Sequence, residues 1–541
     1  MAMLMLSVSS AWAQYVKLTA ENGTVSWIKI DGVINGESIE IYKGERKSVI
    51  NNQTKGSIDL NEVWSESGGI GTHYQVTSIG SWAFYYCSGL TSVVIPSNVT
   101  SIEYATFNYC FGLTSVEIPS SVTSIGQDAF RYCIGLTTIN IPSSVISIGY
   151  GAFRYCKGLT SITIPSSVTS IGDDAFDSCS SLTSVEIPSS VTSIGQDAFS
   201  NCSGLTSVVI PSSVKSIEGG VFWNCSGLTS IDIPSSVTSI GASAFRGCIG
   251  LTTINIPSSV KSIAPYAFSN CIGLTSVVIP SSVTNIEENP FIGCIGLTSI
   301  VVESGNSVFD SRDNCNAIIK TTSNTLIAGC KYTKIPSSVI SIRWYAFSNC
   351  SSLTSVVIPS SVTRIGQSAF SNCSGLTSIT SYITDIFETE TNAFSGCDNA
   401  TLYVPKGLVS TYRSTADWNR INWIEEIPEE IPGAIVLSCN NKGKVIINGR
   451  VQFTNDMGEV SIYDGMDNNF VFIPNENCQL EQVLIDGLDV TLSIKNNKLT
   501  TMIRENSNMI VSFSKSSGDL NGDGQVDISD VVTIVNMILG Q

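Results

Sequence analysis

The sequence predicts a repeat solenoid built mostly of β-strands, and three observations support this fold class. Ten cysteines recur every 23 residues, and the segments between them share one pattern of apolar side chains. Only 13% of the 541 residues are charged, whereas about 25% is usual in globular chains. A 23-residue coil cannot enclose a hydrophobic core alone, so consecutive coils must stack to bury their apolar faces. The regular cysteines are Cys87, Cys110, Cys133, Cys156, Cys179, Cys202, Cys225, Cys248, Cys271 and Cys294.

Each coil contains a short strand and a return limb. In the unit 202–224, Leu205, Val208 and Ile210 follow the pattern L-x-x-V-x-I, which places Val208 and Ile210 on one face of a strand. Pro211 ends the strand because it lacks a backbone donor. A period between about 20 and 29 residues is typical of leucine-rich repeats, so we expect a mostly-β solenoid of the α/β horseshoe type. The opposite wall of its core is formed by Val214, Ile217, Val221 and Phe222.

Segments with other patterns flank the repeats. Strand-like runs before residue 77 predict a cap, since the end of a solenoid exposes its core. The 56 residues between Cys294 and Cys350 indicate a loop or an enlarged repeat over 304–317. The expected order is a signal peptide at 1–13, an N-terminal cap at 14–76, 23-residue repeats at 77–404, a closing helix (407–423) and acidic proline linker within 405–432, a small all-β module at 433–515 and a calcium-binding segment at 518–541.

Charge and hydropathy exclude several classes of partner. The net charge of −17 disfavours nucleic acids and anionic membranes, which need a patch of Lys and Arg. No stretch reaches the roughly 20 apolar residues of a membrane span. Apolar residues 3–6 precede Ala11-Trp12-Ala13, a small-x-small cleavage pattern, which predicts export. We therefore expect a secreted protein or one on the bacterial cell surface.

The repeat C-x-x-L-x-x-I-x-I-P-x-x-V-x-x-I-G-x-x-A-F resembles the consensus of the BspA-like surface proteins, which carry leucine-rich repeats of the treponeme type. The resemblance covers roughly residues 77–404, well over half of the chain. It implies a secreted or cell-surface protein associated with adhesion to host matrix proteins and to other bacteria. The glycine of the consensus is replaced by Glu103, Glu218, Ala264 and Glu287 in some coils, so a positive φ is not expected to be obligatory there.

One residue per coil points outward from the predicted strand and varies from coil to coil. Such a column can change its chemistry without altering the core, which favours ligand recognition. Its candidate ligand-binding residues are Glu117, Asn140, Thr163, Glu186, Asp232 and Asn255. A second column precedes the cysteines and changes from Tyr86, Tyr109, Tyr132 and Tyr155 to Asn201, Asn224, Asn270, Asn349 and Asn372. The tyrosines could contact protein or sugar, or they could form a side-chain ladder along a loop edge.

The sequence does not predict an enzyme. His73 is the only histidine, so neither a Ser-His-Asp triad nor a histidine-based zinc site can be assembled around it. Glu117 and Glu186 lie three coils apart, about 14 Å at strand spacing, and Glu186 and Asp232 lie two coils apart, about 10 Å. Glycosidases need about 5 to 9.5 Å between their carboxylates, so neither pair fits.

The seventeen cysteines allow two interpretations. The regular ones stand beside Phe and Leu, which favours a buried column of thiols acting as small apolar side chains. Stacked, parallel Cβ vectors disfavour disulfides within that column. Cys315 with Cys330 and Cys439 with Cys478 remain candidate pairs.

The last 24 residues contain an EF-hand-like calcium loop followed by an apolar helix over 531–539. Six residues at positions 1, 3, 5, 7, 9 and 12 supply hard oxygen ligands, with Gly524 at the sharp turn. The segment resembles half of a dockerin module, because such modules carry two loop-helix segments and position 12 is Asp here. The predicted Ca²⁺ ligands are Asp519, Asn521, Asp523, Gln525, Asp527 and Asp530.

Two functions remain open. The first is a non-enzymatic, adhesin-like protein that binds a protein or glycan on a host or bacterial surface. The second is a non-catalytic component of a polysaccharide-degrading surface assembly, which the dockerin resemblance implies through a cohesin-like partner. Loop positions 10 and 11 are Ile528 and Ser529 instead of the hydroxyl pair common in dockerins. A half-dockerin could also pair with a second copy, dock on the β module or serve as a calcium-stiffened terminus.

Overall fold

The computed structural model describes most of the repeat region and parts of both flanks. The expected signal peptide, most of the acidic linker and the calcium segment lie outside the described residues. These are 14–20, 24–30, 33–35, 38–41, 54–64, 73–427, 434–439, 443–447, 450–452, 458–461, 467–474, 478–485, 488–489, 498–502 and 508–515.

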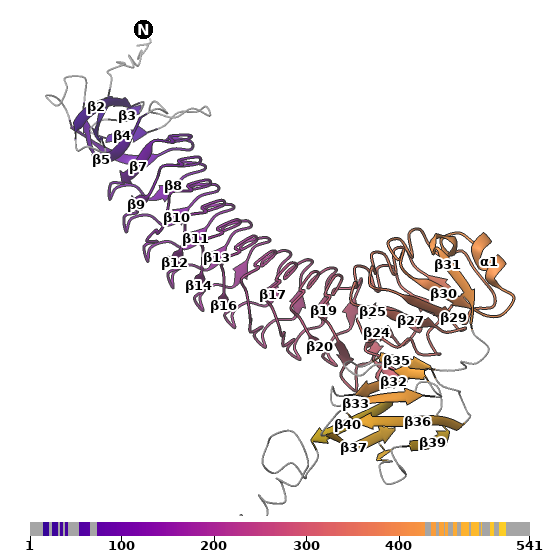
Figure 1. Ribbon diagram of the computed structural model, residues 1–541. Helices are drawn as coiled ribbons and strands as arrows, with labels where there is room; N and C mark the ends of the chain where they lie inside the picture. Colours follow the sequence, from indigo (N-terminus) through magenta and orange to yellow (C-terminus); the bar gives the residue numbers. More distant parts are fainter. Residues whose placement is uncertain are drawn as a thin grey trace, which may run out of the picture.

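Consecutive coils stack into a curved solenoid with a parallel sheet on each of two sides (Figure 1). We call the side formed by the S-V-x-I segments the front sheet and the side formed by the S-I pairs the back sheet. The front strands are β7 (Leu90–Val94), β9 (Ser115–Glu117), β12 (Ser161–Thr163), β14 (Ser184–Glu186), β16 (Ser207–Val209), β20 (Ser276–Ile279), β22 (Ser299–Val302), β27 (Ser355–Ile358), β29 (Ser378–Ser381), β30 (Thr401–Val404) and β31 (Trp423–Glu426).

The back sheet pairs the same position of successive coils. Ser124 is paired with Ser147 and Ile125 with Ile148, so equivalent side chains form continuous rows. The back strands are β8 (Ser101–Ile102), β10 (Ser124–Ile125), β11 (Ser147–Ile148), β13 (Ser170–Ile171), β15 (Ser193–Ile194), β17 (Ser216–Ile217), β18 (Ser239–Ile240), β19 (Ser262–Ile263), β21 (Asn285–Ile286), β25 (Thr325–Gly329), β26 (Ser341–Ile342) and β28 (Arg364–Ile365).

Rows of identical side chains fill the space between the two sheets. Phenylalanine rings from Phe84 to Phe291 stack at centroid distances of 5.3 to 5.9 Å, with interplanar angles of at most 14°. The cysteine column lies beside them, and the thiols from Cys110 to Cys294 each donate to a phenylalanine carbonyl of the preceding coil, as Cys133 Sγ does to Phe107 O at 3.2 Å. All fifteen cysteines whose side chains are described are buried free thiols, so the candidate bridge between Cys315 and Cys330 is not formed.

The N-terminal strands close the first coil, although they do not follow the repeat. Strand β5 pairs antiparallel with β1 and parallel with β7, which continues the front sheet into the flanking segment. Val16, Leu60 and Val63 are fully buried and join the solenoid core. The strands are β1 (Gln14–Thr19), β2 (Val25–Ile30), β3 (Val33–Asn35), β4 (Ser38–Ile41), β5 (Gly56–Trp64) and β6 (His73–Ile79).

An enlarged repeat interrupts the array where the cysteine period breaks. Strands β23 (Phe309–Asp310), β24 (Ala317–Lys320) and β25 form an antiparallel unit, with a 3-10 turn (η1, Arg312–Asn314) between β23 and β24. Strand β25 then pairs in parallel with β26, and the regular coils resume. The buried residues fall into two clusters that meet at this unit.

The end of the solenoid differs from the expected closing helix over 407–423. Helix α1 covers only Val409–Ser414, a second 3-10 turn (η2) covers Trp418–Arg420, and β31 adds a further parallel front strand beside β30. The buried Trp418 ring lies 4.8 Å from Phe394 and so ends the second phenylalanine stack, while its Nε1 donates to Phe387 O. A large aromatic side chain therefore covers the last coil where a long helix was expected.

Beyond the acidic segment the backbone forms two further sheets. Their strand orders are β35-β32-β40-β37-β38 and β34-β33-β36-β39. The strands are β32 (Ala434–Cys439), β33 (Gly443–Ile447), β34 (Arg450–Gln452), β35 (Gly458–Ser461), β36 (Asp467–Pro474), β37 (Cys478–Ile485), β38 (Leu488–Asp489), β39 (Lys498–Met502) and β40 (Asn508–Lys515).

Truncating one ring of the phenylalanine stack should destabilise the array. Phe176 is fully buried between Phe153 and Phe199, so Phe176→Ala leaves a cavity and should cost about 3 to 5 kcal/mol in the free energy of unfolding, measured by urea denaturation. The exposed Lys157→Ala variant should differ from the parent chain by less than about 0.5 kcal/mol. A loss below 1 kcal/mol in Phe176→Ala would contradict this packing.

The cysteine column should make the fold sensitive to alkali. Burial raises the pKa of the Cys156 thiol from 9.0 to about 12. A raised pKa in the folded state means that this stabilisation is complete below pH 9 and is lost as the pH rises from 9 to 12. Each such thiol should reduce the free energy of unfolding by about 1.4 kcal/mol at pH 10. Urea midpoints should therefore stay level from pH 7 to 8 and fall above pH 9.

The matched variant for this measurement is Cys156→Ala. Its stability should decline less steeply with pH than that of the parent chain, because one ionisable group has been removed. Equal slopes for the two chains between pH 9 and pH 11 would show that the thiol does not contribute.

Candidate functional site

The outward residues of the front sheet form an exposed row. Along each front strand the alternating V-x-I residues turn inward and the residue between them faces solvent. Backbone pairing joins equivalent outward positions of adjacent coils into one continuous stretch. It contains Asn140, Thr163, Glu186, Val209, Asp232 and Asn255, all of them exposed. Glu117 is also exposed on the front sheet and pairs with Val94 of the preceding coil.

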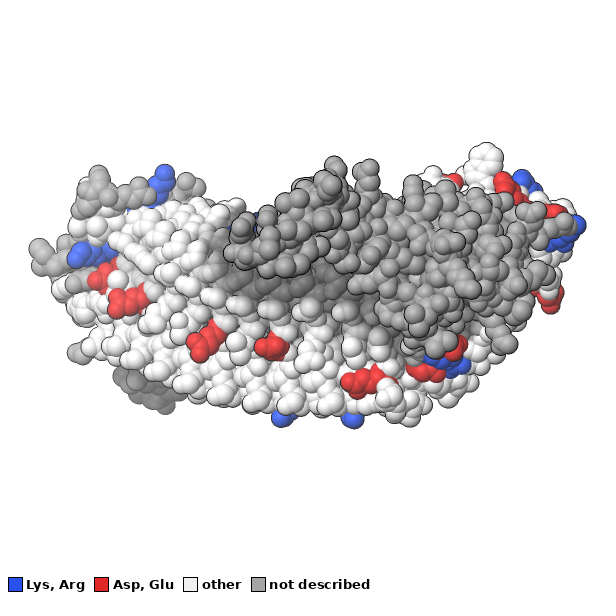
Figure 2. All heavy atoms as spheres, turned by 60° about the horizontal axis from the view of Figure 1, so that its bottom comes forward, with Lys and Arg blue, Asp and Glu red and all other residues white. Residues whose placement is uncertain are grey.

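The centre of this row combines carboxylates with an exposed aliphatic side chain. Val209 is paired on one side with Glu186 and on the other with Asp232. It is 70% exposed, the most of any large hydrophobic side chain among the described residues. Figure 2 turns the lower side of Figure 1 forward and shows few charged groups, mostly separated by uncharged surface, on the described part of that face. The sequence places Val209 in this outward row, but only the polar members of the row were candidate ligand-binding residues.

The front sheet is hollowed at the coil that contains Asn140. In that coil only Asn140 forms a bridge to the next one, and residues 137–139 form no strand. The depression at this coil measures about 330 Å³ and is lined by Asn140 and Thr163 together with Ser115 and Ser161. The structure thus brings two of the predicted residues together at a concave place on the sheet.

The row does not have the geometry of a hydrolytic centre. Glu186 and Asp232 are separated by the coil of Val209, so their strands lie about 10 Å apart, outside the range of glycosidases. His73 lies at the start of β6, where its Nε2 is 2.6 Å from Asn61 O and its ring packs edge-on against Trp64. Within the described part of the chain, no group of three His, Cys, Asp or Glu side chains is placed to hold a metal ion.

The tyrosine column stands on a strained turn. Tyr86, Tyr109, Tyr132 and Tyr155 have φ between 60° and 64°, a left-handed conformation that costs a residue with a side chain about 1 kcal/mol or more. Asn and Gly tolerate this conformation better, and they occupy the same position in most of the later coils. The rings of Tyr109, Tyr132 and Tyr155 stack at 4.6 and 4.4 Å.

Both interpretations of the tyrosine column thus agree with its geometry. The rings form a ladder along the turn edge that is partly accessible to solvent, since Tyr86 is 45% exposed and the other three tyrosines are half-buried. Guanidinium groups flank the ladder, with Arg131 and Arg154 each 5.3 Å from the ring of the following tyrosine. The left-handed turn was not predicted. Asn recurring at one position of a repeat was the signal that could have revealed it.

The asparagine part of this column borders a second depression. Asn224 donates to Asn201 across adjacent coils, at 3.1 Å. Gly247 has φ of 74° and no side chain, which leaves a depression of about 580 Å³ beside Trp223 and Arg246. Amide groups and an indole at a concave place suit a polar ligand, but no residue of this depression belongs to the predicted row.

The predicted Ca²⁺ ligands, Asp519 to Asp530, lie outside the described residues, as do the side chains of Cys439 and Cys478. Among the described segments, none of the helices is both long enough and apolar enough to cross a lipid bilayer.

The repeat pattern and the stacked architecture agree with comparisons to known proteins. The model of the BspA type leucine rich repeat region matches six copies, over residues 77–206, 192–319 and 320–416. The chain belongs to this family. The match spans well over half of the sequence, as the resemblance of the repeat consensus predicted. No curated protein matches this BspA-type chain.

Solved structures of leucine-rich repeat proteins resemble this BspA-type chain. One from Bacteroides ovatus is 29% identical, with a TM-score of 0.52, over 76% of this chain and 98% of its own. A leucine rich cell surface protein from Faecalibacterium prausnitzii is 28% identical over 51% and 93%, with a TM-score of 0.30. A T. pallidum leucine-rich repeat protein is 26% identical over 41% and 87%, with a TM-score of 0.29. The family match and the Bacteroides ovatus structure confirm the mostly-β leucine-rich repeat solenoid.

Proposed function

We propose that this protein is a non-enzymatic, adhesin-like binding protein displayed on the bacterial surface or secreted, and that it recognises a protein or glycan through the front row. The observation that carries the proposal is the exposed triplet Glu186, Val209 and Asp232 on a rigid, in-register sheet. An aliphatic side chain that is 70% exposed between two carboxylates offers both buried area and directional polar contacts to a partner.

The supporting argument is the separation of stability from recognition. The inward Val and Ile of each strand are buried, so they fix the backbone, while the outward residue between them contributes little to the core. Such rows allow a repeat protein to present a long binding surface of variable chemistry. Family membership supports the same function, since the resemblance to BspA-like surface proteins implies adhesion and the similar Bacteroides ovatus structure is that of a leucine-rich repeat protein.

The binding role of the triplet can be tested with a single substitution. Val209→Asp should leave the fold intact, because the side chain is exposed, and should weaken binding to the ligand found on protein and glycan arrays at least tenfold. Ile146→Asp is the matched control, since Ile146 is 54% exposed but lies in the return limb, away from the front row. Equal losses in both variants, or none in either, would contradict recognition through this row.

A second function is favoured by the sequence of the C-terminal loop. The spacing of Asp519, Asn521, Asp523, Gln525, Asp527 and Asp530 supports one Ca²⁺ site and a dockerin-like role in a polysaccharide-degrading surface assembly. In that case residues 518–541 should capture a cohesin-like partner only when calcium is present, whereas an adhesin should retain its ligand after their deletion.

Calcium binding itself can be measured on the full chain. Isothermal titration should detect one Ca²⁺ site, and Asp519→Ala should reduce its affinity at least tenfold because a charged ligand is lost. Asp467→Ala, outside the loop, is the control and should bind as the parent chain does. Unchanged affinity in Asp519→Ala would exclude this loop as the site.

A further inference from the structure

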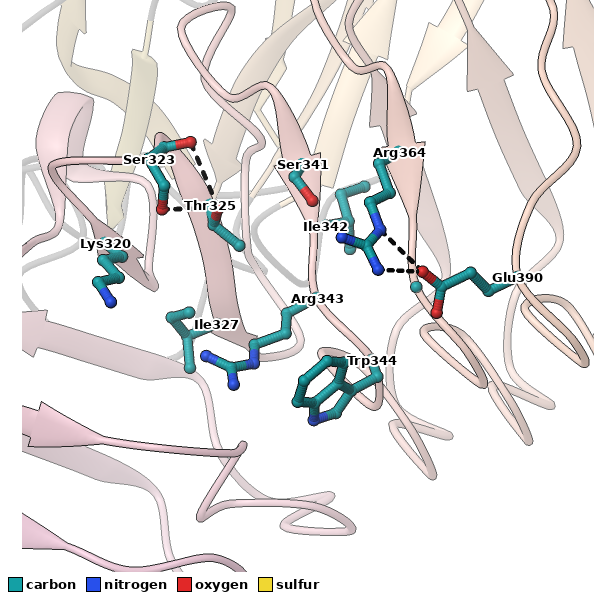
Figure 3. Close-up of a pocket in the computed structure, with 11 residues that line it drawn as sticks. Lys320, Ser323, Thr325, Ile327, Ser341, Ile342, Arg343, Trp344, Arg364 and Glu390 are labelled. Carbon is teal, nitrogen blue, oxygen red and sulfur yellow. Dashed lines mark hydrogen bonds and ion pairs between the residues drawn. The ribbon is translucent and has the colours of Figure 1, made fainter.

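A hollow of about 200 Å³ lies on the back sheet, next to the enlarged repeat. Its walls come from three successive strands, β25, β26 and β28, with β24 at one edge (Figure 3). Three cationic side chains line it, Lys320, Arg343 and Arg364, together with one carboxylate, Glu390. The chain has only 28 Lys and Arg against 45 Asp and Glu, so three cations around one small hollow depart from its general character.

Two of these cations replace the small residues of the regular coils. Pairing of the back strands aligns Thr325, Ser341 and Arg364 in one row. Arg364 therefore stands where regular coils carry Ser, such as Ser124, and Arg343 stands at the position of the consensus glycine. The hollow is thus basic because of local substitutions, and it is unrelated to the acidic front row.

The positive charges of the three cations differ in whether a carboxylate of the chain neutralises them. Arg364 forms an ion pair with Glu390, whose Oε1 lies 2.7 Å from Arg364 Nε. Within the described part of the chain, neither Lys320 nor Arg343 has an ion-pair partner within 4 Å. Figure 3 shows the ends of these two side chains on either side of Ile327.

Arg343 is held in place without being neutralised. Its guanidinium lies 4.4 Å from the centre of the Trp344 ring, and its buried Nε finds no hydrogen-bond acceptor in the described structure. Burial lowers the pKa of Arg343, and the carboxylates of Glu288 and Glu287 offset this only in part. A partly buried guanidinium is costly unless an anion and hydrogen bonds compensate it, so the position favours an external anion.

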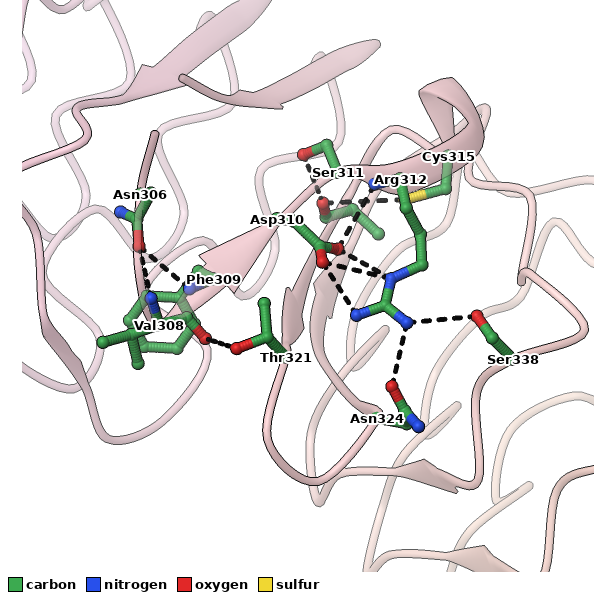
Figure 4. A network of polar contacts seen from close by, with 11 residues as sticks. Asn306, Val308, Phe309, Asp310, Ser311, Arg312, Cys315, Thr321, Asn324 and Ser338 are labelled. Carbon is green, nitrogen blue, oxygen red and sulfur yellow. Dashed lines mark hydrogen bonds and ion pairs between the residues drawn. The ribbon is translucent and has the colours of Figure 1, made fainter. Parts of the chain in front are cut away.

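Hydroxyl groups line the hollow between the cations, since Thr325 is paired with Lys320 and Ser341 with Arg364. Ser323 and Thr325 lie at the start of β25, with their side-chain oxygens 2.8 Å apart, and Ser341 is the neighbour of Thr325 in the next coil. The turn that presents them is fixed by Arg312, which pairs with Asp310 and donates to Asn324 Oδ1 at 2.8 Å (Figure 4). The hydroxyls are therefore part of a rigid turn.

We propose that this hollow binds the acidic group of a single carboxylated or sulfated sugar residue. Arg343 and Lys320 hold the oxyanion, since a guanidinium can bind its two oxygens in parallel and an ammonium adds a point charge. The hydroxyls of Ser323, Thr325 and Ser341 exchange hydrogen bonds with the hydroxyls of the sugar ring.

The size and charge of the surroundings select this ligand class. A long polyanion would be repelled by a chain of net charge −17, whereas one acidic group at the hollow meets the two unpaired cations. An acidic peptide would satisfy the cations but offers no ring hydroxyls to Ser323, Thr325 and Ser341. A neutral sugar would leave the cations uncompensated.

The test uses the full chain and titrates glucuronic acid and glucose 6-sulfate, with glucose, inorganic sulfate and tetraglutamate as comparisons. We expect at least one of the two acidic sugars to bind at least tenfold more tightly than glucose and more weakly at high salt. The stronger of the two identifies the carboxylate or the sulfate as the preferred group. Arg343→Gly, which restores the residue of the regular coils, should weaken that binding at least tenfold, and Lys320→Ala should also weaken it.

Lys215→Ala is the matched control, because Lys215 is exposed beside the back strand β17 and carries the same charge. Equal effects of Arg343→Gly and Lys215→Ala would overturn the proposal, as would equal affinity for glucose. Inorganic sulfate or tetraglutamate binding as tightly as the sugars would overturn the sugar assignment. The hollow shares no residue with the front row. The result for Arg343→Gly therefore does not bear on the proposed function, which is tested separately with Val209→Asp.

Discussion

The structure depends on coils of equal length stacking in register. A single coil buries nothing by itself, and its Val, Ile, Phe and Cys side chains are covered only when the next coil repeats them at the same height. The continuous phenylalanine stack and the thiol-to-carbonyl hydrogen bonds between coils are consequences of that register. Register also determines the surface, because each outward side chain is placed beside the equivalent side chain of its neighbours. Stability and recognition are therefore specified by different residues of the same strand.

The same constraint explains where the backbone accepts strain. Each coil must turn sharply between its phenylalanine and its cysteine, and the residue before the cysteine adopts a left-handed conformation in coil after coil. Asn and Gly meet this requirement at little cost, whereas the four tyrosines do not. Stacking of their rings, with centroids 4.4 Å apart between Tyr132 and Tyr155, offsets part of the cost. The tyrosines form one continuous block in the first four coils, which is where such stacking is available.

The sequence predicted what the period controls and missed what lies outside it. The 23-residue period predicts the buried columns and the exposed row from Asn140 to Asn255. The place where the period breaks predicts the enlarged repeat. The end of the solenoid could not be obtained in this way, because Trp423 to Glu426 becomes a strand only through pairing with β30. The same count also places Val209 in the outward row, but Val209 was not among the candidate ligand-binding residues, because only polar side chains were selected from that row.

The cationic hollow shows how an interruption of the period relaxes the constraint. In the coils that keep the consensus glycine, a side chain there would press on the preceding backbone, as a Cβ on Gly126 would approach Ile102 O to 2.7 Å, whereas other regular coils carry Glu or Ala at this position. The coil before Arg343 is different, because β25 continues as an extended strand to Gly329. A long side chain is accommodated there, and it lies where the array has also gained a new turn with hydroxyl groups. The break in the repeat thus combines a cation at this position with the hydroxyl groups of a new turn, while the pairing of β25 with β26 preserves the register on which the fold depends.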